Sequence, residues 1–190
     1  VSCDEGNKPD LTPTKSPNLP PTSGLVSPSS EPTRHQENIL LTPFQSSLGY
    51  IVEKPVNWDV IPADGSHMDR FILDKEELGS PEVRITKYPA DPDKTLEEYA
   101  DDFYESHQTH YAPSQPDIFT ENGRNFFIME AQHLSGETKV QLIGFIEDGD
   151  LCTIRFEAGL GDAIIYQAVP ISIYRTFDID LNTPPATPLS

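Results

Sequence analysis

Two histidines form the first group of residues whose types and spacing could do chemistry. His107 and His110 lie three residues apart, so on a helix they share one face. With Glu105 or Asp102 beside them, they could bind a divalent metal ion through imidazole nitrogen and carboxylate oxygen. Imidazoles near the C-terminal end of a helix are also stabilised by the helix dipole without a metal. We favour this second interpretation and predict no metal site and no cofactor.

A dense group of carboxylates precedes these histidines and could attract calcium or a basic partner surface. Its members are Asp91, Asp93, Glu97, Glu98, Asp101 and Asp102. Their spacing is not that of an EF-hand loop, which needs alternating oxygen ligands around a central glycine. We expect instead a solvated acidic face on a helix.

The sequence contains no motif for nucleophilic catalysis. No Gly-x-Ser-x-Gly is present, and Cys152 lies in an apolar, strand-like run without a histidine close in sequence. The stretch Gly159-Leu160-Gly161 lacks the third glycine of a dinucleotide site, and no P-loop occurs. We therefore expect Cys152 to be a buried, unreactive thiol and the protein not to be an enzyme. Residues distant in sequence could still assemble a catalytic triad.

The other cysteine, Cys3, is a candidate for covalent lipidation. Val1-Ser2-Cys3 resembles the last three positions of a bacterial lipobox, in which a small residue precedes the cysteine that receives the lipid. A processed lipoprotein would begin at the cysteine itself, and an incidental cysteine near a terminus is the alternative. On the first interpretation, the lipid on Cys3 would hold the protein at a membrane.

The charge of the chain limits its partners. The formal net charge is -18, with 31 Asp and Glu against 13 Lys and Arg. This surplus repels nucleic-acid phosphates and anionic membrane surfaces. We expect no nucleic-acid partner, and membrane attachment only through a lipid or a protein partner.

The composition of the chain predicts three segments. Residues 4–43 are rich in Pro, Ser and Thr and contain no Phe, Tyr or Trp. Proline interrupts helices and sheets, and so few large apolar side chains cannot offset the entropy of ordering. We predict a disordered tether over residues 1–43, a globular domain over 44–180 and a disordered tail over 181–190.

The tether has two alternative roles: it holds the domain away from a membrane, or it becomes ordered along a partner. Its strongest apolar cluster, Ile39, Leu40 and Leu41, is the candidate docking segment. In the domain, Trp58 lies beside a Pro-bounded turn and is the aromatic side chain that we most expect to be exposed to a partner. The core is expected to contain Tyr50, Phe71, Phe126, Phe127, Phe145 and Phe156.

The domain begins with strands, and its hydrophobic period then changes. Strand-like patterns cover residues 48–54, 58–61, 69–74 and 82–88. Thr95 and Glu98 then form a capping box. The apolar residues Leu96, Tyr99, Ala100 and Phe103 follow at helical spacing and predict a helix of about four turns.

The second half reads as a meander of antiparallel strands. Asn122-Gly123, Ser135-Gly136 and Asp148-Gly149 are turn signals. They separate strand-like runs at residues 117–120, 125–133, 138–147 and 151–157. Asp162 is expected to cap a helix that Pro170 ends, and residues 175–179 are expected to form a last strand. This order predicts an α+β domain.

Five features, in order, resemble the PsbP-like superfamily, which includes the PsbP proteins of photosynthetic membranes and bacterial lipoproteins of the DcrB and LpqN kind. They are Pro55-Val56-Asn57-Trp58 after a strand; the strand Val83-Arg84-Ile85; the helix start Leu-Glu-Glu-Tyr-Ala at 96–100; Gly123 before Phe126-Phe127; and Gly149-Asp150-Leu151 with the closing Tyr174-Arg175-Thr176-Phe177. The resemblance covers about the last three quarters of the chain. It implies a central antiparallel sheet flanked by helices, an αβα sandwich, and a binding or accessory role without catalysis.

These observations predict a non-enzymatic accessory or binding protein outside the cytoplasm, in the periplasm or at the cell surface. It would be associated with a membrane through lipidated Cys3 or as a peripheral subunit of a membrane protein complex, and its partner would be a protein. The alternative is a small-ligand carrier or enzyme with a pocket between the sheet and a helix.

Overall fold

The computed structural model describes residues 39–180. Cys3, the predicted tether up to residue 38 and the predicted tail over 181–190 lie outside the described residues. The predictions made for them therefore stay predictions.

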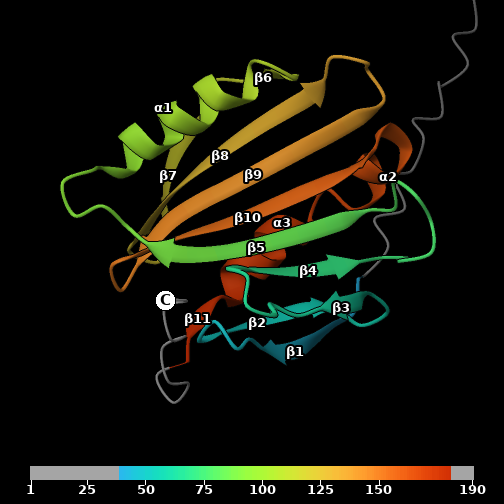
Figure 1. The fold of residues 1–190 in the computed structure, drawn as a ribbon, viewed down its shortest axis with the longest axis horizontal. Helices are drawn as coiled ribbons and strands as arrows, with labels where there is room; N and C mark the ends of the chain where they lie inside the picture. The colour runs from blue at the N-terminus through green and yellow to red at the C-terminus, as the bar shows by residue number, and fades with distance from the viewer. Residues whose placement is uncertain (1–38, 181–190) are drawn as a thin grey trace, which may run out of the picture. The chain divides into compact units, whose positions relative to one another are not determined.

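The described residues form two antiparallel sheets and three helices (Figure 1). The large sheet has the strand order β3-β4-β5-β10-β9-β8-β6, with β7 also paired to β8. Its strands are β3 Asp59–Ile61, β4 Met68–Ile72, β5 Glu82–Pro89, β6 Tyr111–Pro113, β7 Asp117–Glu121, β8 Arg124–His133, β9 Thr138–Glu147 and β10 Asp150–Gly159. The small sheet contains β1 Leu41–Gln45, β2 Tyr50–Pro55 and β11 Asp178–Ile179, and the helices are α1 Leu96–His107, α2 Leu160–Ile165 and α3 Val169–Thr176. The predicted α+β class is confirmed.

Tight turns set the register of the central strands. Asn122 and Gly123 both have positive φ, 54° and 82°, as do Asp148 and Gly149, at 51° and 81°. Positive φ at both central residues defines the type I′ turn, whose twist matches that of a two-stranded ribbon. The meander that these turn signals predict is present as β7, β8, β9 and β10.

One face of the large sheet carries the main core. On β10, the residues Cys152, Ile154, Phe156 and Ala158 point to this face and join the main core. There α3 packs against β2, β9 and β10. All six aromatic side chains that the sequence assigned to the core are at most 4% exposed.

On the opposite face, α1 packs chiefly against β8. Leu96 and Ala100 of α1 contact a second apolar cluster of Phe127, Met129 and Leu142. A Cβ atom at residue 144 would lie 2.2 Å from the Phe127 ring, so this packing requires Gly144. The predicted capping box starts α1: Thr95 Oγ1 accepts from Glu98 N at 3.2 Å, and Thr95 N donates to the Glu98 carboxylate at 2.7 Å.

The fold begins earlier in the chain than the sequence predicted. Leu41 and the Thr42-Pro43 pair, assigned to the tether, belong to β1, which pairs with β2. Proline is tolerated in an edge strand, because its missing N–H need not serve the ladder. The short strand β6 was also missed.

Trp58 is buried, so its predicted exposure is wrong. The residue is 4% exposed, and its ring packs edge-on against Tyr166 with 5.6 Å between centroids. Its carbonyl oxygen also accepts a hydrogen bond of 2.9 Å from Lys54 Nζ. These contacts make Trp58 part of the core.

The C-terminal elements also differ from the prediction. Asp162 lies in the first turn of α2 and does not cap it, because the N-cap is Gly159. Pro170 lies at the start of α3, where its missing N–H has no partner to lose. The strand expected over residues 175–179 is therefore reduced to β11, since α3 continues to Thr176.

A buried carboxylate ties the two sheets together. Asp69 of β4 is 0% exposed and accepts hydrogen bonds from Ser46 Oγ, from Tyr50 Oη at 2.5 Å and from Ala63 N at 2.7 Å. Ser46 and Tyr50 belong to the β1–β2 hairpin, so this carboxylate links the small sheet to the large one. Burial and the Asp69 carboxylate both raise the pKa of Tyr50.

Replacing Asp69 with Ala should lower the free energy of unfolding by roughly 3 kcal/mol, because it leaves buried donors without an acceptor. Urea denaturation monitored by circular dichroism measures this. Asp64→Ala, at an exposed carboxylate in the preceding loop, is the matched control and should change the value by less than about 0.5 kcal/mol. Tyr50→Phe should lower the free energy of unfolding less in the Asp69→Ala background than in the wild type. If the effects of the two substitutions on this free energy simply add, the hydrogen-bond network is contradicted.

Candidate binding surface

Half of one sheet face carries no helix. In Figure 1, α1 crosses the end of the sheet formed by β6, β7 and β8, and in the described part of the chain no other helix lies on that face. The neighbouring strands β10, β5 and β4 carry none of the described helices on this side, although Leu151 and Thr153 of β10 and Ile72 of β4 are buried there. Their side chains here are polar in large part, whereas their other face is in the core.

Strand pairing lines up three arginines on this open face. Arg70 of β4 is directly opposite Arg84 of β5, and Arg84 is directly opposite Arg155 of β10. We call these three residues the arginine row. Two positions along the strands, Glu82 and Glu157 also lie opposite each other. Like charges directly opposite in a sheet are destabilising, so the carboxylates are needed to offset the row.

Glu82 holds one end of the arginine row. It accepts hydrogen bonds from Arg84 Nε and Nη2, both at 3.0 Å, and from Arg70 Nε. Its side chain is only 10% exposed. Burial raises the pKa of Glu82, but the hydrogen bonds and positive charges of Arg84 and Arg70 outweigh burial and hold the pKa below its ordinary value.

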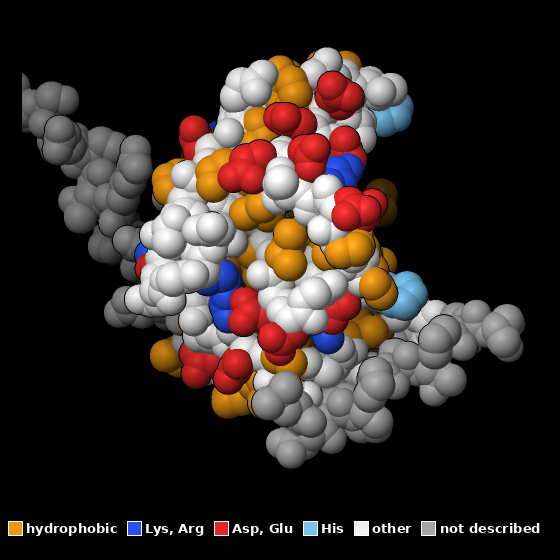
Figure 2. All heavy atoms as spheres, turned by 90° about the vertical axis from the view of Figure 1, so that its left-hand side faces the viewer, with side chains coloured by type: hydrophobic (Ala, Val, Ile, Leu, Met, Phe, Trp, Pro, Cys, Tyr) orange, Lys and Arg blue, Asp and Glu red, His pale blue; other side chains and the backbone are white. Residues whose placement is uncertain are grey.

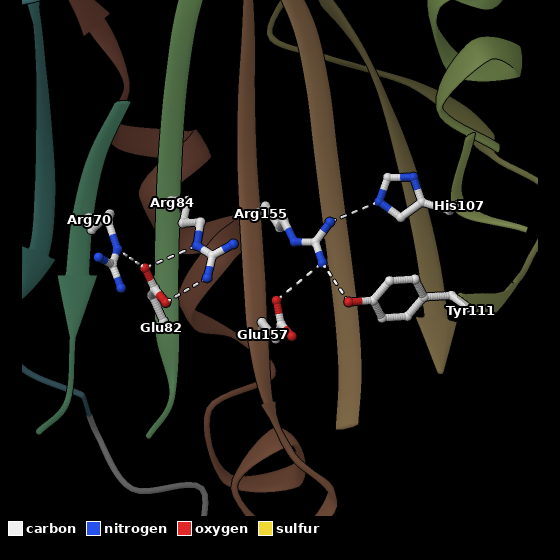
Figure 3. Close-up of polar contacts among 7 residues, drawn as sticks. All are labelled: Arg70, Glu82, Arg84, His107, Tyr111, Arg155 and Glu157. Atoms are coloured by element: carbon white, nitrogen blue, oxygen red, sulfur yellow. Dashed lines mark hydrogen bonds and ion pairs between the residues drawn. The ribbon is translucent and has the colours of Figure 1, made fainter. Parts of the chain in front are cut away.

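Arg155 is the last residue at the other end of the arginine row, and its guanidinium group makes polar contacts with three side chains (Figure 3). Its Nη2 donates to Tyr111 Oη at 3.0 Å and to Glu157 at 3.1 Å, while Nη1 lies 2.9 Å from His107 Nε2. The guanidinium carbon also lies 5.4 Å from the centre of the Tyr111 ring. This end of the row is therefore fixed in position by α1 and β6.

The contacts of His107 define its protonation. The Phe103 carbonyl oxygen, 2.7 Å from Nδ1, can only accept, so Nδ1 carries the proton. Nε2 is then the acceptor for Arg155, and the ring is neutral. Burial lowers the pKa of His107, and the Arg155 charge lowers it further.

These contacts leave His107 without a ring nitrogen for the metal site considered with His110. Both ring nitrogens of His107 are engaged by protein groups, and His110 lies exposed beyond the end of α1. Within residues 39–180, no group of three or more His, Cys, Asp or Glu side chains is arranged to hold a metal ion.

The acidic group around the start of α1 is on the surface. Figure 2 shows Asp and Glu side chains spread over this end of the domain, with few Lys and Arg among them. Two of the carboxylates have structural roles, since Asp102 pairs with Lys94 and Glu98 belongs to the capping box.

The pocket between sheet and helix, considered as an alternative, is represented by two open grooves: one of about 650 Å³ between Tyr88 and α1, and one of about 310 Å³ between the sheet and α2. Between α1 and the sheet, the apolar side chains of the second cluster pack against one another. An open groove of about 780 Å³ lies at the turn between β7 and β8 and is lined by Arg124, Glu147 and Tyr174 among others. Cys152 is fully buried, and burial raises the pKa of its thiol to about 12, which suits an unreactive thiol.

The residues predicted to bind a partner lie elsewhere. Ile39 packs partly buried against the core, Leu40 is 73% exposed, and Leu41 opens β1. The structure does not bring these residues, or Trp58, to the arginine row. Sequence reasoning missed the row, although the alternating pairs Glu82-x-Arg84 and Arg155-x-Glu157 were a signal for charges on one strand face.

Comparison with known proteins identifies the fold. No family model and no curated protein matches the sequence. Among solved structures, the cyanobacterial PsbP (CyanoP) of Synechocystis sp. PCC 6803 has a TM-score of 0.56 at 15% identity, over 74% of this chain and 93% of that chain. LpqN of Mycobacterium tuberculosis, described as involved in cell envelope biogenesis, has a TM-score of 0.52 at 12% identity, over 76% and 93%. The chain therefore has a PsbP-like fold, as the resemblance implied.

None of the helices in the described part is long and apolar enough to cross a membrane.

The neutral state of His107 predicts a pH dependence of stability. Because the folded-state pKa is lowered, the unfolded chain takes up this proton first as the pH falls through about 6.5. The stabilisation is thus present above that pH and is lost below it. Between about pH 7.5 and 5.5, the free energy of unfolding should fall more in the wild type than in His107→Gln, as measured by urea denaturation.

His110→Gln is the control, because His110 is exposed, and it should follow the wild type. Arg155, Glu157 and Tyr111 are the charged or titratable groups around His107 and remain in both variants. Parallel curves for the wild type and His107→Gln would contradict the assignment.

Proposed function

We propose that this protein is a non-enzymatic accessory protein that acts outside the cytoplasm and binds a protein partner through the open face of its large sheet. The observation that carries the proposal is the arginine row. Three guanidinium groups share two carboxylates on a surface without a covering helix.

Arg70 and Arg84 have guanidinium N–H donors that no acceptor in the described residues uses. A guanidinium group has five N–H donors. Within residues 39–180, Arg70 uses only Nε, and Arg84 uses Nε and Nη2, all on Glu82. Their side chains are 34% and 37% exposed. Arginine is enriched at protein interfaces, and its planar group binds carboxylates through paired hydrogen bonds. Carboxylates of a partner protein suit these donors.

Two observations support a location outside the cytoplasm, and the net charge indicates how the protein would be held at a membrane. The domain shares its fold with CyanoP and with LpqN, and LpqN is described as involved in cell envelope biogenesis. Val1-Ser2-Cys3 resembles the end of a lipobox. The net charge of -18 disfavours direct binding to an anionic membrane, so a lipid on Cys3 or a membrane protein complex would supply membrane association.

A small-ligand carrier or enzyme is the second candidate function. The groove beside the β7–β8 turn favours it, because about 780 Å³ of space is lined by polar groups that include two ion pairs. A partner protein fits the arginine row better, because the N–H donors of Arg70 and Arg84 that Glu82 does not use suit carboxylates.

Arg70→Gln and Arg84→Gln should each weaken partner binding roughly fivefold or more, because truncating an interface arginine commonly costs more than 1 kcal/mol. Partners captured from the native source with the wild-type protein are identified by mass spectrometry, and their dissociation constants are then measured for each variant. Circular dichroism checks that the variants are folded.

Arg175→Gln is the matched control, because Arg175 is exposed and pairs with Glu121 near the groove, away from the arginine row. It should bind as the wild type does. Equal binding by all variants would remove the open face from the proposal. Loss of binding in Arg175→Gln alone would favour the groove.

Lipidation of Cys3 predicts a mass increase. Intact-mass measurement of the protein from its native source should show a species that begins at Cys3 and carries acyl chains. In Cys3→Ser the modification should be absent, and the protein should leave the membrane fraction. An unmodified cysteine in the native protein would exclude the lipid anchor and leave the partner-binding proposal standing.

A further inference from the structure

The strand β7 forms an open edge of the large sheet. It pairs with β8 on one side, and within the described residues no strand pairs with its other side. Residues 117–120 are all exposed, including the large apolar side chains Ile118 at 41% and Phe119 at 44%. Exposed edges of this kind are templates for the addition of another strand.

The turn register shows which backbone groups point outward. Glu121 and Arg124 flank the two-residue turn and are a hydrogen-bonded pair. Because such pairs alternate along an antiparallel ladder, Phe119 and Asp117 also direct their N–H and C=O groups to β8. The N–H and C=O groups of Ile118 and Thr120 therefore point away from the sheet.

A side-chain contact agrees with this register. Thr120 Oγ1 lies 2.7 Å from Asn125 Oδ1 on β8, directly across the ladder. Side chains approach most closely at the pairs whose backbone groups do not bond each other. Thr120 is thus at a non-bonded position, with its backbone groups on the open side.

β7 lacks two of the usual protections of an edge strand, a lysine and a proline within the strand. Proteins place Lys, Pro or a bulge on edges to prevent strand addition. No Lys or Arg occurs over residues 111–123, and Pro116 precedes the strand without interrupting it. Five residues of open edge extend about 17 Å.

We propose that β7 binds an extended, basic segment of a partner protein as an added strand. The outward groups of Ile118 and Thr120 supply the backbone hydrogen bonds. Ile118 and Phe119 project to opposite faces. Ile118 therefore contacts the apolar side chains of the segment, whereas its basic side chains lie on the face of Phe119 and Asp117. The only charged side chains over residues 111–123 are Asp117 and Glu121. Glu121 is shared with Arg175, so Asp117 and the net charge of -18 favour a basic segment.

A second copy of the chain fits this edge poorly. Antiparallel self-pairing centred on Phe119 places Asp117 opposite Glu121 twice, and like charges directly opposite are destabilising. Each copy also carries a net charge of -18. The edge lies at the opposite side of the sheet from β4, so this inference does not depend on the arginine row.

The test uses the full chain and a short synthetic peptide in which lysine alternates with valine. The peptide should slow amide hydrogen exchange at Ile118 and Thr120, measured by NMR, more than at Asp117 and Phe119, which already bond to β8. Thr120→Pro removes an outward N–H without touching the β8 ladder, and it should weaken peptide binding roughly tenfold or more. Thr120→Ala, which keeps the N–H, should bind within about twofold of the wild type.

Ile118→Lys is a second variant that does not depend on proline. It adds a positive charge to the edge and should also weaken binding of the basic peptide. A peptide with glutamate in place of lysine should not bind. Undiminished binding in both Thr120→Pro and Ile118→Lys would overturn the proposal, as would peptide-induced protection confined to β4 and β5. A dimer in sedimentation without peptide that Thr120→Pro dissociates would assign the edge to a second copy instead.

Discussion

The area that one short helix can cover is the constraint on which the rest of the structure depends. Helix α1 has 12 residues, so it is about 18 Å long and about 10 Å wide. Neighbouring strands are about 4.8 Å apart, and a helix of this width covers roughly two of them. The large sheet has eight strands. On the α1 face, β10, β5 and β4 extend beyond the helix, and where they do, Arg155, Arg84 and Arg70 are partly exposed.

Apolar and charged side chains alternate along part of β10, so one face of the strand enters the core while the other carries charges. Cys152, Ile154 and Phe156 are buried in the main core, whereas Arg155 and Glu157 between and after them are partly exposed on the other face. A one-residue slip would exchange these two sets. The tight turn at Asp148-Gly149 and pairing on both sides with β5 and β9 prevent such a slip. The register that buries the core is thus the register that aligns the arginine row.

Sequence patterns predicted the elements whose signals are local. The α1 capping box, the Asn-Gly and Asp-Gly turns and the long strands β8, β9 and β10 all depend on residues close together in the chain. The errors arose where distant partners decide. Pro43 was assigned to the tether because its pairing with β2 cannot be seen in the local sequence. Trp58 was expected to be exposed because Tyr166, which packs against it, is more than 100 residues away in the chain. The arginine row could not be predicted in full, because Arg84 meets Arg155 only through the long-range pairing of β5 with β10.

The buried and the exposed sides of β4 are physically connected. Asp69 points into the core, where two donors from the β1–β2 hairpin and one from the loop before β4 bond its carboxylate. Arg70, the next residue, points to the open face and bonds Glu82. Since successive residues of a strand face opposite sides, fixing Asp69 also fixes the backbone from which Arg70 projects. At the other end of the row, Arg155 is fixed by His107, Tyr111 and Glu157. The ordering of these side chains is largely complete before any partner arrives, and such preorganisation reduces the entropy lost on binding. The core that stabilises the fold thereby also prepares the surface proposed to bind.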